Sequence, residues 1–176
     1  MGKNELIAPP LFSTLDLRVG RITEVTPHPT AERMYIEKVD IGNDQSLELV
    51  AEHQPFFSNE ELLDRKVVVL CNLKSVKVNK VKSQGQILTV VNEKGQQELV
   101  DPVEDAEVGE RVIADGEEVV EPVTAIQLKK LKTWENLSKE IKTNNKLEVL
   151  YKEFYPLSTK GGKCTVESMK KAPLAA

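Results

Sequence analysis

Residues 17–25 read LRVGRITEV, and apolar and polar side chains alternate along this stretch. Such alternation predicts a β-strand with one face in a core, and Pro27-His28-Pro29 ends it. The parity places Arg18 and Glu24 on the outer face of the strand. Gly20 interrupts the pattern, which indicates a bulge or the close approach of another backbone.

Further short segments have the same character. Strands are expected at residues 35–41, 46–50, 67–71 and 86–91, and a capped helical turn at residues 59–63. Several short strands at roughly ten-residue spacing, with few helices, predict a small sandwich or barrel. We therefore predict a mainly β protein in which residues 12–118 form a five-stranded oligonucleotide/oligosaccharide-binding (OB) barrel.

The two ends of the chain differ from this central part. Residues 1–11 contain Pro9-Pro10, which predicts an extended arm or linker. Residues 119–171 have helical spacing, with a helix expected around 133–141, and then return to strands around 147–152 and 164–166. About 50 residues rarely bury a core alone, so we expect a small C-terminal α+β extension packed on the barrel. The chain is expected to fray after Met169, with 172–176 as a tail.

Composition excludes several classes of protein. The chain has 176 residues, of which 40 % are hydrophobic and 30 % charged, without a secretory signal or an apolar run long enough to cross a bilayer. A cytoplasmic globular protein without membrane partners is expected. Cys71 and Cys164 are far apart in sequence, so we expect two reduced thiols, with Cys71 buried.

Nothing in the sequence indicates catalysis. His28 and His53 have no metal-ligand or triad spacing, and both are expected to be solvated loop residues. A nucleophile elbow, a dinucleotide fingerprint and a phosphate loop are all absent from the sequence. We therefore expect no enzymatic activity, no cofactor and no metal.

Charge is segregated along the chain. The net charge is −4, yet residues 65–92 carry six cations and no acid. The following residues, 93–121, carry eleven acids against Lys94 and Arg111. Such segregation suits a protein that presents one face to a phosphate backbone, although a solvated lysine-rich hairpin gives the same pattern.

The lysine-rich segment at residues 72–86 also supplies small polar side chains, which together with point cations are what backbone phosphates require. The candidate nucleic-acid-binding residues of this segment are Asn72, Lys74, Lys77, Lys80, Lys82, Ser83, Gln84 and Gln86. Asn79-Lys80 breaks the alternation, as a turn or bulge would.

A set of motifs in fixed order resembles a known family. They are LDLRVGRI at residues 15–22, His28-Pro29, CNLK at 71–74, Ser83-Gln84 and VGERV at 108–112. This order resembles the tRNA-binding domain of the endothelial monocyte-activating polypeptide II family, found free or appended to tyrosyl-, methionyl- and other tRNA synthetases. Trp134 and Gly162-Lys163-Cys164, among others, resemble the extra C-terminal domain of the eukaryotic branch.

The resemblance implies a non-catalytic, structure-selective binder of the tRNA corner that assists an aminoacyl-tRNA synthetase in cis or in trans, with methionyl- or tyrosyl-tRNA synthetase as the expected parent. It assigns binding to Asn72, Lys74, Lys77 and Ser83, and more weakly to Arg18 and Arg21. The extension would replace the second subunit of dimeric bacterial relatives, which gives a monomer with a pseudo-dimeric extension.

Three departures from the family pattern affect the expected site. Asn79-Lys80 stands where the family usually has Arg-Gly, and Gln86 stands where it has methionine. Ala51-Glu52 replaces the usual Ser-Gly and puts an acid near the expected RNA face, so we expect a lower affinity than is typical.

Two other functions stay open at this point. One is a protein-interaction scaffold of a multi-synthetase complex, and the other is a cytokine-like secreted polypeptide. Residues 18–23 resemble the segment tied to cytokine activity in relatives, but they are also typical of an ordinary core strand.

Overall fold

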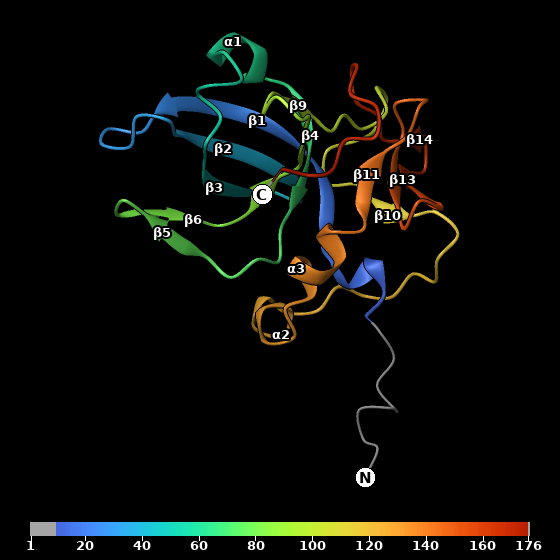
Figure 1. The fold of residues 1–176 in the computed structure, drawn as a ribbon. Coiled ribbons are helices and arrows are strands. Elements are labelled where there is room, and N and C mark those ends of the chain that lie inside the picture. Colours follow the sequence, from blue (N-terminus) through green and yellow to red (C-terminus); the bar gives the residue numbers. More distant parts are fainter. Residues whose placement is uncertain (1–9, 176) are drawn as a thin grey trace.

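The computed structural model describes residues 10–175, so most of the predicted arm at residues 1–11 lies outside the described residues. A curled antiparallel sheet forms the first part of the fold (Figure 1). Its order is β3-β2-β1-β4-β7, where β1 is Leu17–Pro27, β2 Tyr35–Gly42, β3 Gln45–Ala51, β4 Lys66–Leu70 and β7 Gln86–Ile87. β3 comes back into contact with β7, which gives an OB-like half-barrel and confirms the predicted fold class.

Short elements complete this part of the chain. They are the 3₁₀ turn Phe12–Thr14, α1 (Asn59–Leu62), β5 (Val76–Val78), β6 (Val81–Ser83), β8 (Thr89–Val91), β9 (Gln97–Leu99) and β10 (Ile113–Ala114). The predicted helical turn is confirmed as α1, where Ser58 and Glu61 form a reciprocal capping box.

Gly20 allows two strands to approach closely. A Cβ atom at this position would lie 2.7 Å from Cγ1 of Val39. The close approach expected from the sequence is therefore confirmed. The bulge itself lies slightly further along β1, between Ile22 and Glu24.

The central strands are buried on both faces. Ile22, Val67 and Val69 belong to the core cluster inside the half-barrel, whereas Leu17 and Val68 belong to a second cluster that includes residues of the extension. Because two core clusters need both faces of β1, the strand has no solvated face in this region.

The placement of Arg18 on the outer face is therefore wrong. Arg18 pairs across strands with Val69, a residue of the barrel cluster, so its side chain belongs to the barrel side. The prediction assumed a single core, on the face of β1 that carries Leu17. The opposite face, which was expected to be solvated, borders the other core, inside the half-barrel. Glu24, beyond the bulge, is exposed as expected.

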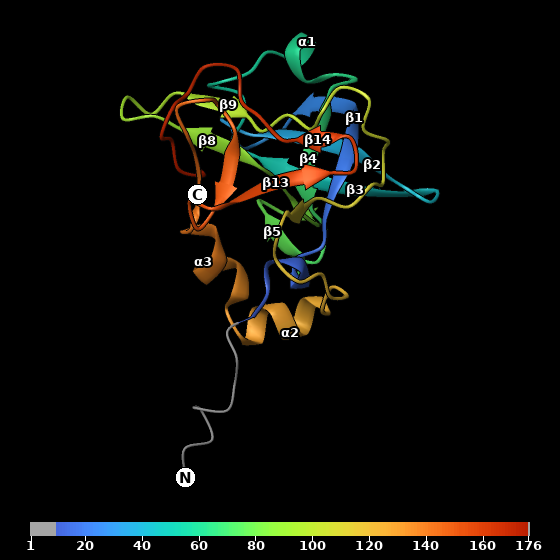
Figure 2. The ribbon, with the colours of Figure 1, turned by 90° about the vertical axis from the view of Figure 1, so that its right-hand side faces the viewer.

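The extension shares its core with the barrel, as expected. It contains α2 (Ala125–Lys130), α3 (Thr133–Ser138), β11 (Ile141–Thr143), β12 (Val149–Tyr151), β13 (Tyr155–Thr159) and β14 (Gly162–Lys163). Trp134, Ile141, Tyr151 and Leu157 pack in one cluster with Leu17 of β1. Figure 2 shows β13 and β14 of the extension lying over the barrel, with α2 and α3 at one end.

The helix predicted around residues 133–141 is confirmed as α3, but it ends at Ser138, and Ile141 already belongs to β11. α2 was not predicted from the sequence. Lys132 has a left-handed backbone with φ 51°, which breaks the helix between α2 and α3. β13, which pairs with β10, β12 and β14, has no counterpart among the predicted strands.

The frayed tail predicted after Met169 is also wrong. Ala172 is buried, and its carbonyl accepts a hydrogen bond from Thr143 N at 2.9 Å. Val91 N donates to Pro173 O, and Ala175 N donates to Thr89 O, both at 2.9 Å. These bonds hold residues 172–175 between β8 of the barrel and β11 of the extension.

In residues 10–175, no helix combines the length and apolar composition that crossing a membrane requires.

Both thiols are free, as expected, but Cys71 is half-buried and Cys164 is the fully buried one. Burial raises the pKa of each thiol to about 12, so neither is a reactive thiolate at neutral pH.

Candidate nucleic-acid interface

Residues 74–83, which we name the lysine hairpin, include β5, β6 and the turn between them. Across the two strands Val76 pairs with Ser83, Lys77 with Lys82, and Val78 with Val81. The turn residues Asn79 and Lys80 have φ 44° and 72°. Two successive left-handed residues define a type I′ hairpin turn, so the predicted turn is confirmed without the glycine of the family pattern.

The four lysines of this hairpin carry uncompensated charge. Lys74, Lys77, Lys80 and Lys82 are all exposed. Within residues 10–175 none of their ammonium groups lies in a salt bridge. Lys77 and Lys82 even lie directly opposite each other, an arrangement that destabilises a hairpin. An unpaired cationic surface of this kind suits a polyanionic ligand.

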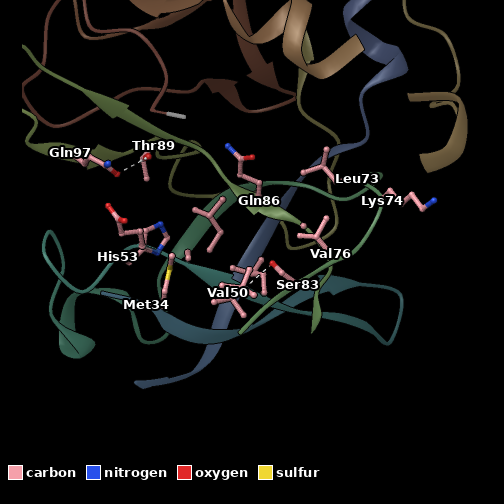
Figure 3. Close-up of a pocket in the computed structure, with 16 residues that line it drawn as sticks. Met34, Val50, His53, Leu73, Lys74, Val76, Ser83, Gln86, Thr89 and Gln97 are labelled. Carbon is pink, nitrogen blue, oxygen red and sulfur yellow. Dashed lines mark hydrogen bonds between the residues drawn. The ribbon is translucent and has the colours of Figure 1, made fainter. Parts of the chain in front are cut away.

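The other face of the hairpin borders a groove. Val76, Val78 and Ser83 line this groove of about 430 Å³, together with Lys74 and Gln86 (Figure 3). Because side chains alternate along a strand, Lys77 and Lys82 lie on the opposite face. The hairpin therefore has one cationic face and one face toward the groove.

Ser83 and Gln84 fasten the hairpin to β3. Ser83 is buried, and its Oγ accepts a hydrogen bond from Val50 N at 3.0 Å. Glu48 N donates to Oε1 of Gln84, and Gln84 N donates to the carbonyl of Glu48, both at 2.9 Å. These contacts make Ser83 and Gln84 positioning residues of the hairpin.

Asn72 fastens the beginning of the same segment. Its side chain is buried, and Oδ1 accepts a hydrogen bond from Asp16 N at 2.9 Å. Nδ2 donates to Thr14 O at 3.0 Å and to Val123 O at 2.9 Å. One amide group thus ties the loop after β4 to the start of β1 and to the segment leading into the extension.

Of the two candidate arginines, Arg18 is held in an ion pair, and Arg21 lines a groove other than the one beside the lysine hairpin. Arg18 donates two hydrogen bonds of 2.9 Å to the Asp16 carboxylate, and this pairing raises the pKa of the guanidinium above its ordinary value. Arg21 donates to Asp64 O at 2.9 Å and lines a different groove, shared with Lys163 of the extension. The structure brings together the candidates from Lys74 to Gln86, but Arg21 is not among them.

The prediction that both histidines are solvated is wrong. His28 and His53 are each only 5 % exposed. Nδ1 of His28 accepts from Thr30 N and Ala31 N at 3.1 Å, so Nε2 carries the proton and donates to Val78 O at 3.1 Å. His28 therefore anchors the lysine hairpin to the loop after β1. Short-range spacing could not reveal this long-range contact.

We expect His28→Ala to loosen the hairpin, because the variant loses a buried hydrogen bond worth about 1–2 kcal/mol. Amide hydrogen exchange in residues 76–83 should accelerate about tenfold, measured by mass spectrometry. His28→Gln is the matched control, since its amide can still donate to Val78 O. Unchanged exchange of these residues in His28→Ala would show that the anchor contributes nothing.

Within the acid-rich residues 93–121, Gln97 lines the groove beside the lysine hairpin, whereas Gly109 lies at the other end of β2. Gly42 in the β2–β3 turn packs against Gly109, and a Cβ on Gly42 would lie 2.7 Å from the Gly109 Cα. Figure 1 shows β10, which follows this contact, on the side of the molecule away from β5 and β6.

Glu52, the acid expected near the RNA face, does line the groove, and it forms a 3.2 Å ion pair with Arg33.

An OB-like half-barrel with an exposed cationic hairpin, whose lysines form no salt bridge among the described residues, is typical of a nucleic-acid-binding module. The family model described as "Putative tRNA binding domain" matches residues 17–111. The chain belongs to this tRNA-binding domain family.

Curated relatives and a solved structure extend the similarity beyond the barrel. The chain is 40 % identical over 156 residues to "Probable methionine--tRNA ligase" of Oryza sativa, covering 88 % of this chain and 19 % of that protein. It is 36 % identical over 160 residues to the cytoplasmic tyrosine–tRNA ligase of Danio rerio, covering 90 % and 30 %. The chain thus spans under a third of these curated relatives.

The C-terminal domain of Plasmodium vivax p43 superposes with a TM-score of 0.85 at 26 % identity, covering 93 % of this chain and 98 % of that domain. Barrel and extension together therefore have a counterpart in one solved domain. The chain is homologous to a tRNA-binding domain and not to a catalytic domain.

Proposed function

We propose that the chain binds the outer corner of folded tRNA through the lysine hairpin and so assists an aminoacyl-tRNA synthetase in cis or in trans. The observation that carries this proposal is the set of four exposed lysines on one hairpin, none of which forms a salt bridge within residues 10–175. Lys77 and Lys82 contact phosphates, with Lys74 and Lys80 at the two ends of the hairpin. Asn72, Ser83 and Gln84 position it.

The chemistry of the hairpin supports recognition by shape. A-form RNA is recognised mostly by shape and by phosphate and 2′-hydroxyl contacts, and ammonium groups on flexible stems meet phosphates without reading base identity. A tethered second site of this kind raises the local concentration of tRNA near a catalytic domain. The similarity to methionine and tyrosine ligases supports a synthetase partner, and the cytoplasmic names among these relatives support that compartment.

The shared core supports a monomer in which the extension takes the place of a second subunit. The apolar outer face of β1 and β4 is covered by Trp134, Tyr151 and Leu157 of the same chain. This face therefore needs no partner copy.

Val19, Gly20 and Ile22 of the cytokine-like segment are buried in β1, which favours a core strand over an accessible signalling motif.

Salt dependence tests the proposal directly. If four lysines each neutralise one phosphate, the logarithm of the affinity should fall with the logarithm of salt concentration at a slope of about −3. Fluorescence anisotropy of labelled tRNA between about 0.05 and 0.4 M KCl measures this slope. A slope near zero would contradict binding through phosphates.

A further inference from the structure

A buried acid–histidine pair lies beneath the groove beside the lysine hairpin. The Glu37 carboxylate is 0 % exposed, and its Oε2 lies 2.7 Å from Nδ1 of His53. His53 lines the groove, as Figure 3 shows. The pair comes from β2 and from the loop after β3, and the lysine hairpin does not use it.

The pair holds the imidazole in one orientation. The His53 ring packs edge-on against Phe57, with centroids 5.4 Å apart and an interplanar angle of 89°. Nδ1 is bonded to Glu37, whereas Nε2 has no hydrogen-bond partner among the described residues and is not fully enclosed. The second oxygen of Glu37 is buried and has no partner in the same part of the chain. A fixed ring with one free nitrogen is typical of a site that binds a polar ligand.

We propose that this groove takes one unpaired nucleoside of the bound RNA, whose base or ribose forms a hydrogen bond with Nε2 of His53. This inference rests on the proposed function, because the lysine hairpin has to hold the RNA beside the groove. The volume of about 430 Å³ lies within the range of small-ligand pockets, about 300–1,000 Å³.

The lining favours a neutral nucleoside over a phosphate. Met34, Leu49 and Ile87 give apolar contact surface, and Gln86 and the Thr89–Gln97 hydrogen bond add neutral polar groups. Glu37 beneath His53 and Glu52 in the lining would repel an anion inside the groove. Lys74 also lines the groove and can hold a flanking phosphate. Splayed, unstacked nucleotides are the parts of a folded RNA that such a groove can accept.

The two histidines of this chain provide an internal control for the test. Long-range ¹H–¹⁵N spectra of the ¹⁵N-labelled protein resolve both imidazoles, with unlabelled tRNA or a fully paired RNA duplex added. We expect tRNA to shift the His53 Nε2 signal well beyond any shift of His28, because both His28 nitrogens already have protein partners. The duplex should leave His53 in place because it offers no unpaired nucleoside.

The outcomes separate this inference from the proposed function. Bound tRNA with an unmoved His53 signal overturns the nucleoside groove and leaves the lysine hairpin intact, as does an equal shift with the duplex. Failure of both RNAs to bind overturns the proposed function as well.

A variant provides a second, independent readout. His53→Asn keeps an amide N–H near the position of Nδ1, and so the bond to Glu37, but removes the nitrogen that faces the groove. Affinity for tRNA should fall about tenfold with an unchanged salt slope and unchanged duplex binding. Thermal unfolding verifies that the variant is folded, and wild-type affinity for tRNA in the folded variant would overturn the inference.

Discussion

Replacing Lys77 and Lys82 together by alanine is expected to weaken tRNA binding about 40-fold at 0.1 M salt. Each phosphate contact contributes about 0.8 to the slope of log affinity against log salt. Taking 1 M salt as the reference at which these contacts contribute nothing, the loss of two contacts lowers the logarithm of the affinity by about 1.6 at 0.1 M salt. The slope itself should fall from about −3 to about −1.5. Anisotropy titrations at several KCl concentrations measure both quantities. Stability should rise slightly, because the two like charges oppose each other across the hairpin.

A matched double variant separates a local effect from net charge. Lys160 lines a groove with Asp105 and Glu110, and Lys163 pairs with Glu148 at 2.9 Å, so both lie among acids. Replacing these two lysines by alanine removes the same formal charge from another surface and should change affinity only slightly. Equal losses in the two double variants would show that tRNA responds to total charge, and the lysine hairpin would then not be the site.

The lysine hairpin could be predicted from sequence because its signal is local. Alternation around Val76 and Val78, the Asn79-Lys80 break and the absence of acids from residues 65–92 all lie within a short stretch. The structure adds the cross-strand pairing of Lys77 with Lys82. The outward placement of the lysines follows directly from strand parity.

Features that depend on distant partners could not be predicted in this way. His28 is held in a buried position by a hydrogen bond from its Nε2 to the carbonyl of Val78, fifty residues later in the chain. Arg18 lies on the barrel side of β1, and not on a solvated face, because the extension supplies a second core against β1. Residues 172–175 are ordered because β8 and β11 offer them free backbone groups. In each case the prediction was wrong because a long-range contact, which the local pattern does not contain, decided the outcome.

Asn72 was predicted to bind RNA from its place in the CNLK motif, but its surroundings favour a positioning role. All three of its hydrogen bonds go to backbone groups, namely those of Asp16, Thr14 and Val123. Asn72→Ala removes these three bonds, although Thr14 O keeps a hydrogen bond from Val123 N at 3.1 Å. At about 1 kcal/mol for each lost bond, the free energy of unfolding should fall by about 3 kcal/mol, measured by urea denaturation.

Two further variants distinguish positioning from contact. Asn72→Asp keeps an acceptor for Asp16 N but sets a carboxylate against the carbonyls of Thr14 and Val123, so it should destabilise the fold at least as much as alanine does. Lys74→Ala should show the reverse pattern, with weaker tRNA binding and unchanged stability, because its ammonium group is exposed and unpaired in the described chain. If Asn72→Ala lost affinity at wild-type stability, Asn72 would be a contact residue. The hydrogen bond from Asn72 to Val123 O would then have no part in shaping the RNA-binding surface.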